Sequence, residues 1–185
     1  MTEELTAIGI VELTSIAAGI EVSDLMLKRA EVSLVRAHPI CPGKYLAVVS
    51  GEVGSVRDAV ATARDAAGAH LVEDEVISQV APEVFPALTM STEVSEIKAL
   101  GVIETFSAAS CLVAADAAVK ASPVKLIEIR LGMGVAGKSF LTLTGDVDPT
   151  RDAVAAGVEA IEETGGLLNA VVIPGPHADL HERLY

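Results

Sequence analysis

One of the two cysteines, Cys41, lies where a thiol could bind a metal. It is at the centre of Arg36–Gly51, which is typical of a strand, a tight Cys-Pro-Gly turn and a second strand. A single thiol at such a tip is ordinary in most proteins. It becomes chemically significant only if the fold brings several copies of the turn together. The alternative is that Cys41 is a small residue at a turn.

The second cysteine, Cys111, is expected to play no such part. It lies among Ala, Leu and Val in a predicted helix over 107–121, where a free cysteine usually behaves as a small buried hydrophobe. We expect a reducing cytoplasmic environment, because the N-terminal residues lack the basic start of a secretory signal. Both cysteines are therefore predicted to be free thiols or metal ligands and not a disulfide pair.

A phosphate-binding motif competes for the segment Gly132–Ser139. Its sequence, GMGVAGKS, fits the P-loop pattern and follows a predicted strand. Phosphate binding by a P-loop requires a helix that begins at the Lys-Ser pair, so that its first amides point at the anion. The next residues, Phe140–Gly145, alternate as a strand does and stop at glycine. A hairpin is therefore favoured over nucleotide hydrolysis.

Other groups that could do chemistry are few. His38 precedes Cys41 by three residues and could line the same site, although a solvated histidine at a strand end is favoured. His177 and His181 have an i,i+4 spacing that permits metal binding, but no third ligand is evident and surface positions are favoured. Glu12 and Glu104 recur at matching places, where a structural role is favoured over catalysis. We predict no enzymatic activity.

Composition and charge exclude several classes of partner. The chain of 185 residues is 51% hydrophobic and only 3% aromatic, with a net charge of -13. Nucleic acids and anionic membranes attract clustered lysines and arginines, which the sequence lacks. It also lacks an apolar run of about 18 residues that could span a bilayer. The expected location is cytoplasmic, without nucleic-acid or membrane partners.

The chain contains an internal repeat. Ala7–Val35 recurs as Ala99–Ile127, 92 residues later, and Gly43–Val60 recurs as Gly137–Val154, 94 residues later. The difference assigns two extra residues to the second hairpin loop. Pro82 and Pro176, 94 residues apart, are taken to end the two copies. We predict two domains, residues 6–90 and 97–185, joined by the polar stretch between them.

The pattern of each copy predicts a ferredoxin-like α+β domain, β-α-β-β-α-β with a short terminal helix. In the first copy we expect strands at 6–13, 32–40, 44–51 and 71–79, and helices from Ser15 to about Ala30 and from Ser55 to about Ala67. Ser15 is a predicted N-cap, and Ser55 with Asp58 resembles a capping box. In the second copy, Asp148-Pro149 is the expected helix start.

These same segments carry a family resemblance. AIGIVELTSIAAGI, DLMLKRAEVSLV, GKYLAVVSGEVGSVRDAV and IPGPH resemble the bacterial microcompartment shell-protein domain. Two such domains in tandem resemble the trimeric tandem-domain shell proteins, most closely those of propanediol-utilisation microcompartments. The resemblance spans both halves of the chain, in the usual element order.

The resemblance implies a homotrimer that forms a flat pseudohexagonal tile beside other shell proteins, around enclosed enzymes, with redox enzymes among its potential partners. Its pore would be lined by the loops between the second and third strands of each copy: His38, Pro39, Ile40, Cys41, Pro42, Gly43, Gly132, Met133, Gly134, Val135, Ala136 and Gly137. The tile edge would use Lys28, Lys120 and His177. Many family members have arginine where this chain has Gly175, which removes part of the expected edge contact.

The resemblance also nominates Cys41 as the ligand of a 4Fe–4S cluster shared by three chains, for electron transfer or cluster transport across the shell. Three-fold symmetry would supply three thiolates and leave the fourth iron to another ligand. Two alternatives remain open: an electron-transfer module whose purpose is the cluster and not the tile, and a ferredoxin-like trimer that binds a small molecule or nucleotide without a shell role.

Overall fold

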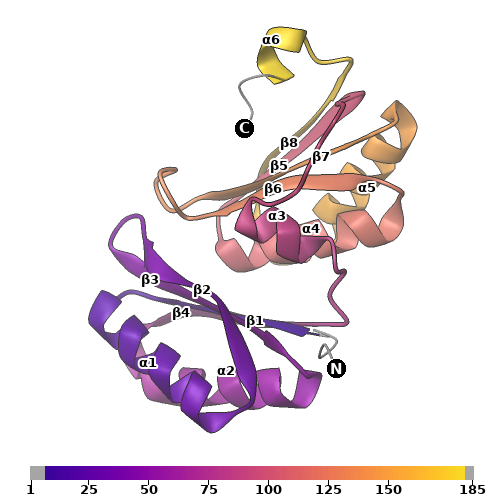
Figure 1. Cartoon of the computed structure of the whole chain (residues 1–185). Coiled ribbons are helices and arrows are strands. Elements are labelled where there is room, and N and C mark those ends of the chain that lie inside the picture. Colours follow the sequence, from indigo (N-terminus) through magenta and orange to yellow (C-terminus); the bar gives the residue numbers. More distant parts are fainter. Residues whose placement is uncertain (1–6, 182–185) are drawn as a thin grey trace. The chain divides into compact units, whose positions relative to one another are not determined.

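The chain folds as two compact units, and a computed structural model describes residues 7–181 of it. The first unit comprises the described residues up to Val80 together with Gly132–Gly137, and the second comprises Ala81–Leu131 and the described residues from Lys138 onward. In each unit a four-stranded antiparallel sheet carries two helices on one face (Figure 1). The predicted α+β fold with a tandem repeat is confirmed.

The sheet of the first unit has the strand order β2-β3-β1-β4. The elements in chain order are β1 (Ala7–Leu13), α1 (Ile16–Arg29), β2 (Val32–Ile40), β3 (Lys44–Gly51), α2 (Val53–Ala67), a 3-10 turn η1 (Gly68–His70) and β4 (Leu71–Ser78). The predicted strands at 32–40 and 44–51 are confirmed to the residue.

The second unit repeats this topology with the order β6-β7-β5-β8. It begins with α3 (Val84–Thr89) and continues with β5 (Ala99–Thr105), α4 (Ala108–Ala121), β6 (Lys125–Leu131), β7 (Ser139–Gly145), α5 (Val147–Glu159), β8 (Leu167–Pro174) and α6 (Ala178–His181). Segment Ala81–Thr89, which ends the first repeat in sequence, therefore packs as part of the second unit.

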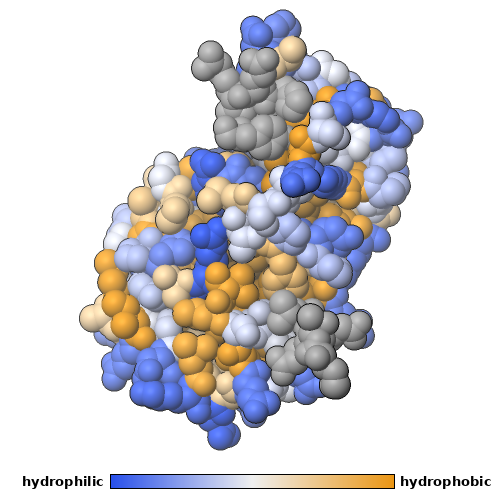
Figure 2. All heavy atoms as spheres, in the orientation of Figure 1, coloured by the Kyte–Doolittle hydropathy of each residue, from blue (hydrophilic) through white to orange (hydrophobic). Residues whose placement is uncertain are grey.

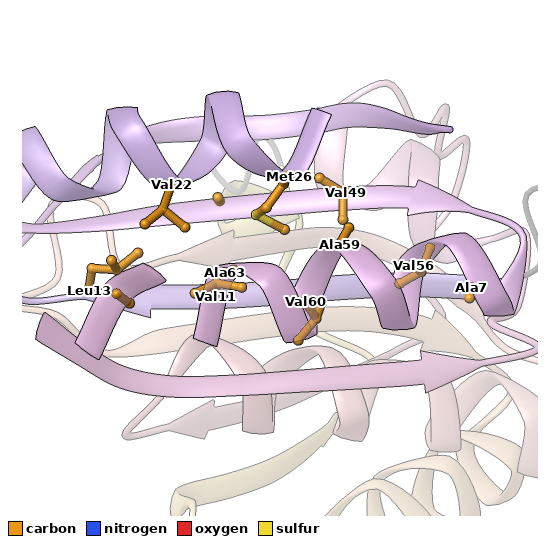
Figure 3. Packing of buried hydrophobic residues seen from close by; sticks show 12 residues of the cluster. Ala7, Val11, Leu13, Val22, Met26, Val49, Val56, Ala59, Val60 and Ala63 are labelled. Atoms are coloured by element: carbon orange, nitrogen blue, oxygen red, sulfur yellow. The ribbon is translucent and has the colours of Figure 1, made fainter. Parts of the chain in front are cut away.

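Small aliphatic side chains form the core of the first unit (Figure 3). Val22 and Met26 of α1 and Ala59 and Ala63 of α2 pack against the sheet, and each is at most 2% exposed. Alanine and valine allow close packing of the helices on the sheet, so little room is left for a ligand between the two layers.

The helix starts were predicted with mixed success. Ser15 caps α1 as expected, because its hydroxyl accepts a hydrogen bond from the backbone N–H of Ala18 at 3.3 Å. The capping box at Ser55 is wrong: α2 begins at Val53 after Glu52, without a side-chain cap. The start at Asp148-Pro149 is also wrong, since α5 begins at Val147. Both helices begin two residues before the predicted start, and a single residue separates them from the ends of β3 and β7.

The match between Pro82 and Pro176 is wrong by two residues. Strand β1 pairs Ala7 with Ser78, whereas β5 pairs Ala99 with Pro174, so the two copies are 96 residues apart at their last strands. A longer turn between α5 and β8 adds the extra residues. His177 is therefore the counterpart of Ala81, and Leu180 that of Val84.

The two units use different pairs of side chains where the first helix of the repeat meets the third strand. In the first unit Gly19 lies under the ring of Tyr45, and a Cβ atom added at Gly19 would be 2.4 Å from that ring. In the second unit the same two positions hold Cys111 and Ser139, both fully buried. A small helix residue opposite a large strand residue has been exchanged for two residues of intermediate size. This exchange accounts for a cysteine inside α4.

Candidate functional site

The candidate site is the hairpin between β2 and β3, whose tip is Cys41, Pro42 and Gly43. The turn is closed by a hydrogen bond from the Gly43 N–H to the Ile40 carbonyl, at 2.9 Å. Gly43 has φ +85°, a conformation that favours glycine, and nothing lies within 4 Å of the place where its Cβ would be. The tip therefore combines a fixed backbone with open space beside it.

Cys41 is a free, half-buried cysteine whose backbone is held from both sides. Its N–H donates to the Gly132 carbonyl at 3.1 Å. Its own carbonyl would be 2.6 Å from a Cβ atom at Gly137, where φ is +83°. Gly132–Gly137 thus forms a close backbone cradle around Cys41 within the first compact unit. The cradle fixes the main chain and leaves the thiol partly accessible.

The other predicted pore residues lie around this tip. His38 and Pro39 are near the end of β2. The His38 Nδ1 atom is 3.2 Å from the Pro39 carbonyl oxygen. Met133 and Gly134 are exposed in the Gly132–Gly137 loop, with Val135 half-buried and Ala136 exposed at φ +55°.

The P-loop alternative for this loop fails on geometry. The chain continues directly into β7 from Ser139, so no helix begins at the Lys-Ser pair. Without that helix no row of N-terminal amides points at a phosphate group. The predicted hairpin is confirmed.

A buried ion pair anchors the base of the first hairpin. The Lys44 ammonium donates to Glu12 Oε1 at 2.6 Å, and the Glu12 side chain is only 4% exposed. In the second unit the corresponding pair, Lys138 and Glu104, is longer at 3.3 Å, and the Glu104 side chain is 36% exposed. These pairs supply the structural role favoured for the two glutamates. Sequence analysis missed their partners, although a glutamate and a Gly-Lys pair recur in both copies.

The two thiols differ in reactivity. Burial raises the pKa of Cys111 to about 12, although a hydrogen bond with Thr105 opposes the shift. A thiol with that pKa stays protonated at neutral pH and is a poor metal ligand. Cys41 is half-exposed at the hairpin tip, whereas Cys111 is buried. Of the two cysteines, only Cys41 is placed to react or ligate.

The remaining predicted metal and edge residues form no recognisable metal site among the described residues. No group of three or more His, Cys, Asp or Glu side chains that could hold a metal occurs within residues 7–181. His177 is exposed and interacts with Asp179, while nothing can be said of the His181 side chain. Lys28 and Lys120 each form an i,i+4 ion pair, with Asp24 and Asp116, at 2.5 Å.

Comparison with known proteins identifies the family of the chain. The family model described as the BMC domain matches twice, at residues 7–80 and 99–176. The chain belongs to the bacterial microcompartment shell protein family. It is 42% identical to the microcompartment shell protein PduT of Citrobacter freundii, over 96% of this chain and 97% of that protein. Microcompartment shells are therefore its location, as the resemblance implied.

Two further relatives support this assignment. The shell protein EutM of Salmonella typhimurium is 40% identical over 86 residues, which cover 46% of this chain and 88% of EutM. A crystal structure of a microcompartments protein from Desulfitobacterium hafniense is 48% identical, covers 97% of this chain and 99% of its own, and superposes with a TM-score of 0.92. The chain is thus a shell protein of the tandem-domain type. Among the described helices, none has the length and apolar character needed to cross a bilayer.

Proposed function

We propose that this shell protein forms a homotrimer with a central pore, and that three Cys41 thiolates at the pore bind one 4Fe–4S cluster. The observation that carries the proposal is the position of Cys41 at a hairpin tip. Cys41 is half-exposed there, and a hydrogen bond from its backbone N–H to Gly132 holds it in place. A single chain offers one suitable thiolate, and a three-fold axis would multiply it to three. The protein would act as a structural tile, not as an enzyme.

The residues at the tip fit such a group. Thiolate sulfur is the usual protein ligand of iron–sulfur iron. The open space beside Gly43 leaves room for a bulky group, and the glycines of the cradle keep side chains away from the tip. The backbone hydrogen bond from Cys41 to Gly132 holds the ligand residue in place before the group binds. A cluster bound there would supply one-electron transfer at the pore.

This chain's own residues would position the ligands and limit access. The buried Glu12–Lys44 pair fixes the base of the hairpin, so the tip is held at a defined height on the sheet. Three thiolates leave one iron without a cysteine, which is where water, a small molecule or a protein partner would bind. Such an open position suits electron transfer or cluster exchange across the shell, with an enclosed redox enzyme as a potential partner.

Anaerobic purification tests the proposal. We expect a brown protein with broad visible absorption and about one cluster per three chains by iron and sulfide analysis. Cys41→Ser should lose the colour and keep its oligomeric state, whereas Cys111→Ala should keep both. A wild-type trimer that stays colourless after reconstitution with iron and sulfide would overturn the cluster and leave the tile. A wild-type monomer would overturn both.

A further inference from the structure

The first helices of the two repeats differ in what covers them. Three apolar side chains of α1 are exposed, Ile16 at 39%, Ile20 at 57% and Leu27 at 41%. Their spacing places them on one face of the helix. In α4 the counterparts of Ile16 and Ile20 are Ala108 and Leu112, which are 1% and 0% exposed. One apolar face is thus exposed and its repeated copy is buried.

The cover of α4 comes from Ala81–Thr89. Helix α3 packs against both β6 and α4, and its Val84 is fully buried. The Ala81 N–H donates to Asp116 Oδ1 at 2.8 Å, while Lys120 occupies Oδ2 of the same carboxylate. This hydrogen bond fixes the covering segment at one point on α4.

The sheet edge beside α1 is uncovered in the same way. Leu34 of β2 is 41% exposed, whereas its counterpart Leu126 of β6 is 1% exposed. Figure 2 shows apolar residues at the surface over α1 and β2 of the first unit. Exposed apolar side chains that gather on one face are typical of an association surface.

The chain also carries the matching cover, at the end of its second repeat. By the strand register, His177 corresponds to Ala81 and Leu180 to Val84. Leu180 is 40% exposed, although Val84 is buried. Among the described residues, the His177 N–H makes no hydrogen bond, and Asp24 Oδ1 accepts none. Within the described residues, His177 and Asp24 thus provide an unused donor and an unused acceptor at the positions that correspond to Ala81 and Asp116, which pair with each other.

We propose that the segment Gly175–Leu180 of one chain covers the α1 and β2 face of a second copy. The His177 N–H donates to Asp24 Oδ1 of that copy, and the Leu180 side chain packs against Ile20 and Leu34. The contact joins two different surfaces, so it is head-to-tail and closes into a ring at a suitable rotation. This inference rests on the proposed self-association and specifies the surfaces that produce it.

An engineered disulfide tests the contact. Asp24→Cys and His177→Cys are combined in a Cys41→Ser background, and the purified protein is oxidised and run on a denaturing gel without reductant. We expect covalent oligomers up to the size of the ring, here three chains, and release of monomers by reductant. An equimolar mixture of the two single variants, refolded or co-expressed, should give covalent dimers. Each contact joins residue 24 of one chain to residue 177 of another, so it needs one chain of each variant.

A matched control places the second cysteine elsewhere. Asp58 is exposed on α2, away from the proposed surface, so Asp58→Cys with His177→Cys should stay monomeric on the same gel. Equal cross-linking in this control, or no cross-linking of the first pair in a protein that sediments as a trimer, would overturn the inference and leave the proposed trimer. A wild-type protein that sediments as a monomer would overturn both.

Sedimentation of two charge variants gives an independent reading. Ile20→Asp and Leu180→Asp each place a charge in the proposed contact, and we expect the mass to fall from the trimer to the 19.0 kDa chain. Met90→Asp, at a residue that is 61% exposed outside the contact, should stay trimeric. Trimers in both test variants with unchanged stability would contradict the contact. Circular dichroism checks that each variant is folded.

Discussion

Helices α1 and α4 have the same length and the same place in the repeat, yet they differ in burial. Four residues of α1 are buried, whereas nine residues of α4 are. The sequences reflect this: α1 carries isoleucine and leucine at exposed positions, and half of α4 is alanine, with a buried Asp116. The comparison shows that the same helix can be covered within the chain in one repeat and left exposed in the other, so the burial of a residue in one repeat does not predict the burial of its counterpart.

The largest difference is expected for equivalent apolar residues. Leu112→Ala removes a fully buried side chain and should lower the free energy of unfolding by about 2–5 kcal/mol. Ile20→Ala should cost less than about 1 kcal/mol, since the side chain is exposed in the single chain. Denaturant unfolding measures both, in the Leu180→Asp background so that association does not contribute. Equal losses would show that the two helices are covered alike.

The exchange between Gly19–Tyr45 and Cys111–Ser139 predicts a rescue. Gly19→Cys forces a side chain into the Tyr45 ring and should destabilise the protein by about 1–3 kcal/mol or more. Adding Tyr45→Ser reproduces the pair of the second unit and should restore at least half of that loss. A double-mutant cycle of unfolding free energies measures the coupling. Additive effects would mean that the two positions are independent.

The two hairpin anchors should differ as well. Lys44→Ala leaves the carboxylate of Glu12 buried without its partner, which should cost about 1–3 kcal/mol. Lys138→Ala breaks a longer and more exposed pair and should cost less than about 1 kcal/mol. Thermal unfolding of the two variants provides the comparison, and Lys138→Ala is the control for loss of a surface lysine. A larger loss of stability for Lys138→Ala than for Lys44→Ala would contradict the conclusion that the Glu12–Lys44 pair is the stronger anchor.

The two thiols should differ in their reactivity towards alkylation, and Cys111 should also affect how stability changes at alkaline pH. At pH 8 iodoacetamide should modify Cys41 and spare Cys111, which peptide mass spectrometry detects. The raised pKa of Cys111 stabilises the fold below the unfolded value of 9.0, and this contribution is lost as the pH rises towards about 12. Cys111→Ala should therefore show a weaker alkaline loss of stability than wild type. Modification of Cys111 in the native protein at pH 8 would contradict its burial.

Sequence periodicity and the repeat predicted the element order, because local patterns of two and 3.6 residues decide strand and helix. Ser15 was correctly predicted as a cap, since its position before an apolar run is a local signal. The starts of α2 and α5 were missed because tight connections from β3 and β7 begin those helices without a side-chain cap. The prolines were misaligned because the turn lengths before β4 and β8 differ.

The site was predictable only in part. Cys41 at a turn could be read from its neighbours, but the cradle at Gly132–Gly137 depends on contacts between residues about 90 positions apart. The Glu12–Lys44 ion pair was within reach, because both residues recur in the second copy. The segment that covers α4 could not be predicted from the sequence of α4, because the cover depends on which distant segment folds over the helix.

The different side-chain pairs of the two units, Gly19 with Tyr45 and Cys111 with Ser139, restrict recombination between the two halves of the gene. A crossover between the two halves of the gene that joined α4 to β3 would set Cys111 against Tyr45, and the reverse crossover would leave a gap between Gly19 and Ser139. Both hybrids would be less stable than either parent half. The two repeats can therefore no longer overwrite each other's sequence freely, which allows one tip to keep its cysteine while the other keeps its glycines.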